Sequence, residues 1–130
     1  IGQEKAPYTG VVETYSDNGV LAGKAEFKDG KMNGASKIYY PNGKLASEAT
    51  FKDNIPVGVQ KDYYENGKVK YELPYKNGQM DGVAKEYYPS GKIKIEEPYK
   101  NGQIDGVAKA YDESGKVIQQ ATFKNGQQIQ

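Results

Sequence analysis

The chain has 130 residues, enough for one domain, and its 18 Lys and Arg residues nearly balance its 17 Asp and Glu residues, for a net charge of +1. This balance gives no broad positive field, so we expect no binding to nucleic acid and no insertion into a membrane. The chain has no His and no Cys, which excludes disulfides, Ser-His-Asp hydrolysis and the usual zinc sites. We therefore expect no enzyme activity and no cofactor.

The first seven residues, IGQEKAP, do not follow the pattern of the rest of the chain. We expect residues 1–7 to form a lead-in to a single repeat domain over residues 8–130. They show no basic-then-apolar signal pattern, although the missing initial Met is consistent with removal of an upstream piece. We favour an exported or cell-envelope location over the cytoplasm.

From Tyr8 onward the sequence repeats every 24 residues, as YKNGQMDGVAK (75–85) and YKNGQIDGVAK (99–109) illustrate. A fixed period of this length is the signature of a repeat architecture. Most glycines fall in three columns, and so do three sets of apolar residues. The apolar columns are Tyr15, Tyr39, Tyr63, Tyr87 and Tyr111; Leu21, Leu45, Val69, Ile93 and Val117; and Phe27, Phe51, Tyr75, Tyr99 and Phe123.

Two of the glycine columns predict two different hairpin turns in each repeat. In YPNGK (40–44), Pro41 fixes φ and Gly43 supplies the left-handed conformation of a three-residue loop with a bulge. In KNGQ (76–79), the Asn-Gly pair favours a two-residue type I′ turn. The remaining column follows a turn too closely to form another, so it predicts a bulge or a bare backbone beneath an aromatic ring. Its members are Gly10, Gly34, Gly58, Gly82 and Gly106.

Between the turns, side chains alternate with a period of two, as in VAKEYY (83–88), which predicts strands. Frequent glycines and many aromatic or β-branched residues argue against helices. The predicted fold is all-β: an elongated, twisted antiparallel meander of about ten strands, made of five 24-residue β-hairpin repeats. We expect the three apolar columns to share one face, and strong twist or curling to close their rows against each other, because a single sheet must hide a face.

The opposite face is expected to carry the candidate binding residues. A second tyrosine column occurs only in the middle repeats, since Ser16 and Asp112 take its place at the ends, and a lysine column flanks it. Aligned tyrosines combine apolar area with a polar tip, as recognition surfaces require. The alternative is that paired tyrosines simply suit strands and the lysines keep a face soluble. The candidates are Tyr40, Tyr64, Tyr88, Lys44, Lys68 and Lys92.

Three carboxylates are expected on this same face, once per repeat and beside lysines: Glu48, Glu72 and Glu96. Paired carboxylates can hydrolyse glycosides, but here no pair is singled out from the repeat. The main internal departure, Pro56 in DNIPVG (53–58), adds no catalytic group.

The unit GVAKEYYPSGKIKIEEPYKNGQIDG (82–106) resembles the MORN-variant repeat, a relative of the membrane occupation and recognition nexus repeat. The resemblance covers residues 8–130 in five in-phase copies. It implies an elongated antiparallel sheet of hairpins, and a grouping of bacterial proteins commonly labelled as antitoxins of a toxin–antitoxin or toxin–immunity type. The family offers no catalytic motif, so no functional position carries over to this chain.

Choline- and glucan-binding cell-wall repeats share a period near twenty, NGK turns and Tyr-Tyr pairs, but their ligand cages depend largely on Trp, which this chain lacks. A quaternary-ammonium or glucan site on the tyrosine column is the weaker interpretation. The leading hypothesis is a monomeric, non-enzymatic scaffold that binds a protein partner, specifically a toxin that it neutralises. The alternative is a carbohydrate- or wall-binding module of the cell envelope.

Overall fold

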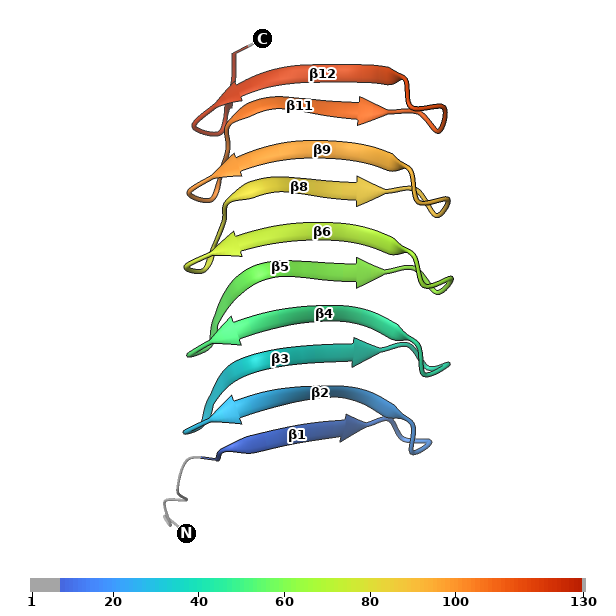
Figure 1. Ribbon diagram of the computed structural model, residues 1–130, viewed down its shortest axis with the longest axis vertical. Coiled ribbons are helices and arrows are strands. Elements are labelled where there is room, and N and C mark those ends of the chain that lie inside the picture. The colour runs from blue at the N-terminus through green and yellow to red at the C-terminus, as the bar shows by residue number, and fades with distance from the viewer. Residues whose placement is uncertain (1–7, 130) are drawn as a thin grey trace.

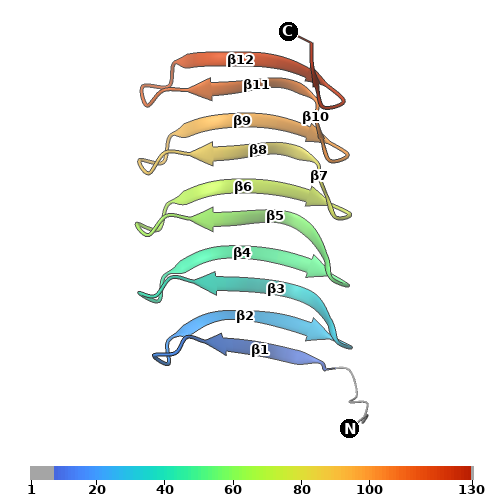
Figure 2. The ribbon, with the colours of Figure 1, turned by 180° about the vertical axis from the view of Figure 1, so that it is seen from behind.

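The computed structural model describes residues 8–129 as one antiparallel sheet in which each strand pairs with its neighbours in the chain (Figure 1). No helical segment within residues 8–129 has the length and hydrophobicity that a membrane span requires. Ten strands of six to nine residues form the ladder that Figures 1 and 2 show from its two sides. These are β1 (Gly10–Tyr15), β2 (Leu21–Lys28), β3 (Lys31–Tyr39), β4 (Leu45–Lys52), β5 (Ile55–Tyr63), β6 (Val69–Lys76), β8 (Gly82–Tyr87), β9 (Ile93–Lys100), β11 (Gly106–Tyr111) and β12 (Val117–Lys124).

Three further strands have two residues each: β7 (Gln79–Met80), β10 (Gln103–Ile104) and β13 (Gln127–Gln128). β7 and β10 lie at the starts of the segments that continue as β8 and β11. The predicted all-β meander of repeating hairpins is confirmed. The predicted lead-in over residues 1–7 lies outside the described residues.

Both predicted turn types are present. Asn77 and Gly78 have φ angles of 52° and 84°, as a type I′ turn requires, and Asn54 takes the place of the glycine with a φ of 70°. In the YPNGK loop, the amide of Gly43 donates to the carbonyl of Tyr40 at 2.8 Å, and the amide of Tyr40 donates to the carbonyl of Lys44 at 2.8 Å. These two bonds close the three-residue loop that the sequence predicts.

The third glycine column forms a bulge, as one of the two expectations stated. Between the pairs Phe27↔Met32 and Ala25↔Ser36, one residue of β2 faces three residues of β3, including Gly34 at a φ of 116°. β3 and β5 visibly curve as they leave the preceding turn (Figure 1). The side chain beside the glycine is not always an aromatic ring, since Pro98 lies against Gly106.

A second bulge beside the YPNGK-type loops changes which residues share a face. The β8–β9 register shifts at Tyr87, which pairs with Ile93. The hydroxyl of Tyr87 donates to Oε1 of Glu72 at 2.7 Å, which places Tyr87 on the face that carries Glu72. Tyr99 lies on the other face, because β9 alternates without a register shift from Glu96 to Tyr99. The shift at Tyr87 instead places its partner Ile93 on the face of Tyr87. The expectation that all three apolar columns share a face is therefore wrong: the extra residue of the bulge reverses the alternation.

We name the two faces by their central features. The ladder face carries the Tyr15 and Leu21 columns and a central row of alternating charge, and the ring face carries the Phe27 column. The charged row is Lys37, Glu48, Lys61, Glu72, Lys85, Glu96 and Lys109. The expectation that Glu48, Glu72 and Glu96 lie on the candidate binding face is thus wrong, as the Tyr64 and Tyr88 contacts below show.

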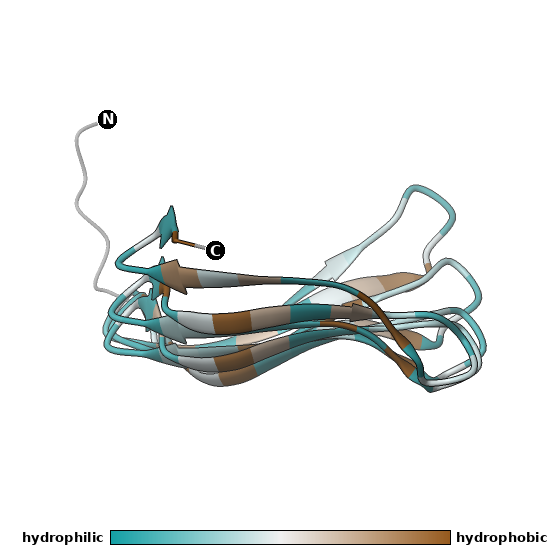
Figure 3. Cartoon of the chain, turned by 90° about the horizontal axis from the view of Figure 1, so that it is seen from above, coloured by the Kyte–Doolittle hydropathy of each residue, from teal (hydrophilic) through white to brown (hydrophobic). Residues whose placement is uncertain are grey.

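The sheet is a single open layer, with apolar bands recurring at matching positions of successive strands (Figure 3). Among the described residues only Ala84 is buried, with 5% of its surface exposed. The expectation that twist or curling closes the apolar rows is wrong, because no pairing joins β1 to the strands at the other end. Without a closed core, the bonds between successive repeats gain importance.

Candidate functional site

The three candidate tyrosines bond each hairpin to the next. The hydroxyl of Tyr64 donates to the carbonyl of Tyr87 at 2.6 Å, and that of Tyr88 donates to the carbonyl of Tyr111 at 2.6 Å. The hydroxyl of Tyr40 donates to the next tyrosine carbonyl in the same way. The rings are half-buried. Their polar tips are therefore occupied by structural bonds, and only ring faces and edges remain for a partner.

The candidate lysines lie on the same rim. Nζ of Lys44 donates to the carbonyl of Glu65 at 3.4 Å, and Nζ of Lys68 donates to the carbonyl of Ser90 at 3.0 Å, each in the following loop. Lys92 holds the equivalent position one repeat on, and all three lysines are exposed. We call the six candidate residues the Tyr–Lys strip.

Two more lysines extend this strip onto the ring face. Nζ of Lys70 lies 5.7 Å from the ring centroid of Tyr64 and 5.4 Å from that of Tyr71, and Nζ of Lys94 lies 5.6 Å from that of Tyr88. Cation–π contacts of this kind hold the ammonium groups over the rings. Lys94 also pairs with Oε2 of Glu86 at 3.6 Å. Sequence reasoning missed both lysines, although the signal is the motif GKxK in the third and fourth repeats.

A different set of bonds ties the repeats at the opposite rim, where the type I′ turns lie. The amide of Gly102 donates to the carbonyl of Met80 at 2.8 Å, and the amide of Asn101 donates to Oδ2 of Asp81 at 3.2 Å. Asp105 accepts the equivalent bond from Asn125 one repeat later, at 3.3 Å. Met80 and Asp81 of YKNGQMDG therefore anchor the next turn, a role that the sequence pattern did not reveal.

The ladder face carries a recurrent tyrosine–carboxylate pair. The hydroxyls of Tyr63 and Tyr87 donate to Glu48 and Glu72. Burial, followed by the hydrogen bond to the carboxylate, raises the pKa of Tyr63 and of Tyr87 to about 12. Both phenols are therefore neutral donors at pH 7. Residues 8–129 hold no group of three acidic side chains placed to bind a metal ion.

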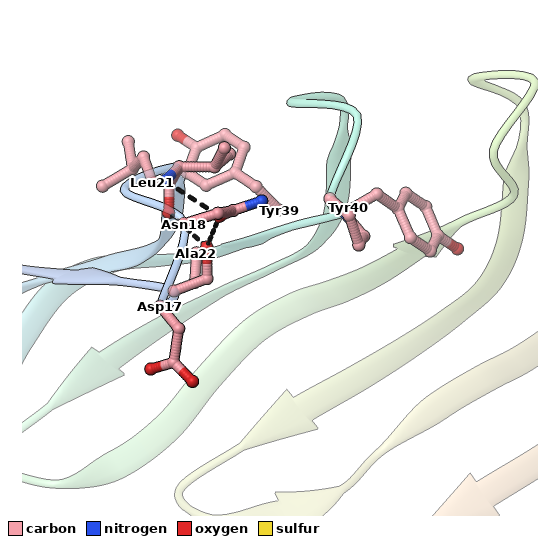
Figure 4. Close-up of a pocket in the computed structure, with 9 residues that line it drawn as sticks. Asp17, Asn18, Leu21, Ala22, Tyr39 and Tyr40 are labelled. Carbon is pink, nitrogen blue, oxygen red and sulfur yellow. Dashed lines mark hydrogen bonds between the residues drawn. The ribbon is translucent and has the colours of Figure 1, made fainter.

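A hollow of about 440 Å³ separates the first two loops, where Ser16 replaces the tyrosine of the middle repeats. Figure 4 shows Tyr39 beside Leu21 on its wall, while Tyr40 points away toward the following repeat. In the first loop, Oδ1 of Asn18 accepts a hydrogen bond from the amide of Val20 at 3.3 Å. The first hairpin thus lacks the tyrosine bond to its neighbour.

Tandem hairpins bonded at both rims, with both faces of the sheet open, define a repeat scaffold rather than a closed domain built around one pocket. The chain belongs to the MORN repeat variant family, whose model matches it over residues 8–29, 32–53, 56–77, 80–101 and 104–125. The resemblance to this repeat is therefore confirmed.

No curated protein matches the chain. Among solved structures, a chain of the glycosylation-associated protein (Gap123) complex from Streptococcus agalactiae is similar, with 20% sequence identity and a TM-score of 0.45. The similarity covers 80% of this chain and 19% of that one.

Proposed function

We propose that this chain is a non-enzymatic scaffold that binds a protein partner through the Tyr–Lys strip, and that the partner is a toxin which the complex neutralises. The observation that supports binding at this place is the strip itself. Three half-exposed rings in a row carry lysines at their edges, and the end repeats replace these tyrosines with Ser16 and Asp112. The proposal that the partner is a toxin rests on the family resemblance, since bacterial members of this repeat family are commonly labelled as antitoxins.

The dimensions of the strip suit a macromolecular surface. Tyr40 and Tyr88 are four strands apart in the ladder, which corresponds to about 19 Å at a strand spacing of about 4.8 Å. A contact of that length, flat and without an enclosed pocket, is typical of protein interfaces rather than of small-ligand sites.

The charge of the strip indicates the kind of surface that it fits. Lys68 and Lys92 are exposed, and Lys70 and Lys94 lie over rings on the same side. Only Glu86 is close enough to pair with one of these four lysines among the described residues. The strip is thus locally basic and aromatic on a nearly neutral chain, and we expect an acidic partner surface.

Charge reversal tests this proposal without breaking the tyrosine bonds. We expect Lys68→Glu with Lys92→Glu to weaken partner binding by about a hundredfold, because like charges facing each other across an interface cost several kcal/mol. Lys76→Glu with Lys100→Glu makes the same charge change at the other rim and should leave binding unchanged. The measurement is capture of the partner from a native cell lysate, its identification, and titration of the purified partner with each variant.

Two outcomes would contradict the binding of a protein at the Tyr–Lys strip. Equal binding by the two double variants would place the partner elsewhere on the sheet. Retention of the chain on isolated cell wall or glycan, with no protein captured, would favour the carbohydrate-binding alternative. The toxin-neutralising role is supported if the captured partner inhibits growth when expressed alone and co-expression of this chain restores growth. A partner that does not inhibit growth would contradict that role, while its binding would still support a protein-binding scaffold.

A further inference from the structure

The ladder face carries charges that alternate strictly over seven successive strands. Lys61 pairs across strands with Glu48 on one side and Glu72 on the other, and the alternation continues from Lys37 to Lys109. Among the described residues, the single ion pair within 4.0 Å is between Lys94 and Glu86, away from this row. The lysines of the row are therefore not engaged by the carboxylates beside them.

Two apolar stripes run along either side of this row. One consists of exposed valines and their cross-strand neighbours: Val59 is 50% exposed and pairs with Pro74, and Val83 is 46% exposed and pairs with Pro98. The other combines the Tyr15 and Leu21 columns, for example Val69, which lines a shallow hollow together with Glu72 and Tyr87. The ladder face is thus apolar at both sides and charged along its middle.

From this arrangement we infer that the ladder face binds the ladder face of a second copy of this chain. The two copies are related by a two-fold axis that runs parallel to the strands, midway between β6 and β8. This rotation keeps each stripe opposite the same stripe and reverses the order of strands. Each β8 then covers β6 of the other copy, and each β9 covers β5.

The charges match in this register. Lys85 meets Glu72 of the second copy, and Lys61 meets Glu96. Lys109 meets Glu48, so symmetry gives six opposite-charge pairs and no like-charge pair. At the ~10 Å spacing of packed sheets, a lysine and a glutamate from opposing strands can reach each other. A two-fold axis parallel to the charged row would instead place each lysine opposite the same lysine of the second copy, and each glutamate opposite the same glutamate.

Sequence differences near the ends select this register. Lys24 is the cross-strand neighbour of Lys37, which breaks the alternation at β2. If the axis were shifted by one strand, to the midpoint between β5 and β6, Lys24 would lie opposite Lys109 of the second copy. In the proposed register, β1 and β2 lie beyond the overlap, and Lys37 meets the neutral Gln120.

The apolar stripes also match. Val83 meets Pro74 of the second copy, and Tyr87 meets Val69. Eight overlapping strands with about six residues each cover on the order of 800 Å² per copy, from strand spacings of about 4.8 Å and about 3.4 Å per residue. A stable interface buries about this area on each partner. The charges set the register, and the apolar stripes contribute most of the affinity. The inferred dimer differs from the monomer that the sequence analysis favoured.

Sedimentation equilibrium of the full chain and of paired charge variants tests this inference. We expect the wild-type chain of 14.3 kDa to form a dimer, and Glu72→Lys alone or Lys85→Glu alone to weaken self-association by about a hundredfold. An equimolar mixture of the two variants should form dimers again. In the mixed pair, one copy carries lysine at both positions 72 and 85 and the other carries glutamate at both, so every charge at these positions faces one of opposite sign.

Controls separate the interface from folding. Glu113→Lys in an exposed loop and Lys28→Glu in β2, which lies beyond the overlap, make the same charge changes at exposed positions and should dimerise like the wild type. Circular dichroism shows whether each variant is folded. Lys85→Glu keeps Glu72, the acceptor of Tyr87, so it tests the interface even if Glu72→Lys unfolds. A monomeric wild type, a dimer unaffected by Lys85→Glu, or a folded mixture that stays monomeric would overturn the inference. These variants leave every residue of the Tyr–Lys strip unchanged, and sedimentation measures self-association in the absence of the partner, so either result is independent of partner binding.

Discussion

Replacement of Tyr40, Tyr64 and Tyr88 together by serine is expected to lower the free energy of unfolding by about 6 kcal/mol. Each tyrosine is half-buried and donates a hydrogen bond to the next hairpin. Removal of a half-buried aromatic ring costs about 1 kcal/mol, and loss of its hydrogen bond costs about 1 kcal/mol more. The three sites lie in different repeats, so their effects should add. Small domains have only about 5–15 kcal/mol of stability, so this variant should lose a large share of it.

Urea denaturation followed by circular dichroism measures this effect, with the triple phenylalanine variant as the matched control. Phenylalanine keeps the ring and removes only the hydroxyl, so we expect a loss of about 3 kcal/mol. A loss below about 2 kcal/mol for the serine variant would show that the tyrosines do not hold the repeats together, and would leave their side chains free for recognition alone. Because the tyrosines also stabilise the fold, the binding experiment changes the lysines of the strip and leaves the tyrosines intact.

Gly106→Ala is expected to lower the free energy of unfolding by about 3 kcal/mol. Gly106 has a φ of 122°, and a Cβ at this position would lie 2.9 Å from Cγ of Pro98. A non-glycine residue in this backbone region costs about 1–3 kcal/mol, and the clash adds to this because a proline ring has little freedom to move. Thermal or urea unfolding of the single variant measures the loss.

The chain offers two controls for this substitution. Gly115 also has a positive φ, of 91°, but a Cβ there would meet nothing within 4 Å, so Gly115→Ala should cost only about 1 kcal/mol. Adding Pro98→Ala to Gly106→Ala should recover part of the loss by removing the clash. If Gly106→Ala and Gly115→Ala cost the same, close packing of proline on the bulge contributes nothing to stability.

The sequence predicted the parts of the fold that short motifs determine. The 24-residue period, the Asn-Gly turns and the YPNGK loops each specify local backbone geometry, so the meander followed directly. The faces were predicted wrongly because the residue opposite Tyr87 depends on a register shift between two strands. A rule of simple alternation has no way to represent that extra residue.

The candidate site was predicted in position but not in chemistry. Tyr64, Tyr88, Lys68 and Lys92 do lie along one rim, and whether they bind a partner stays a prediction. Their bonds to carbonyls of the next repeat could not be foreseen, because backbone groups leave no trace in residue identity. The cation–π contact of Lys70 was missed for a similar reason, since the bulge determines where that side chain lies.

Bonds between repeats at the two rims, rather than a core, hold the sheet and leave its faces open. Amide hydrogen exchange in two hairpins tests this dependence. The first hairpin lacks a tyrosine bond to its neighbour because Ser16 stands at that position, whereas Tyr64 bonds the third hairpin to the fourth. We predict that paired amides of β1 and β2 exchange at least about tenfold faster than those of β5 and β6. Equal exchange rates in the two hairpins would contradict the claim.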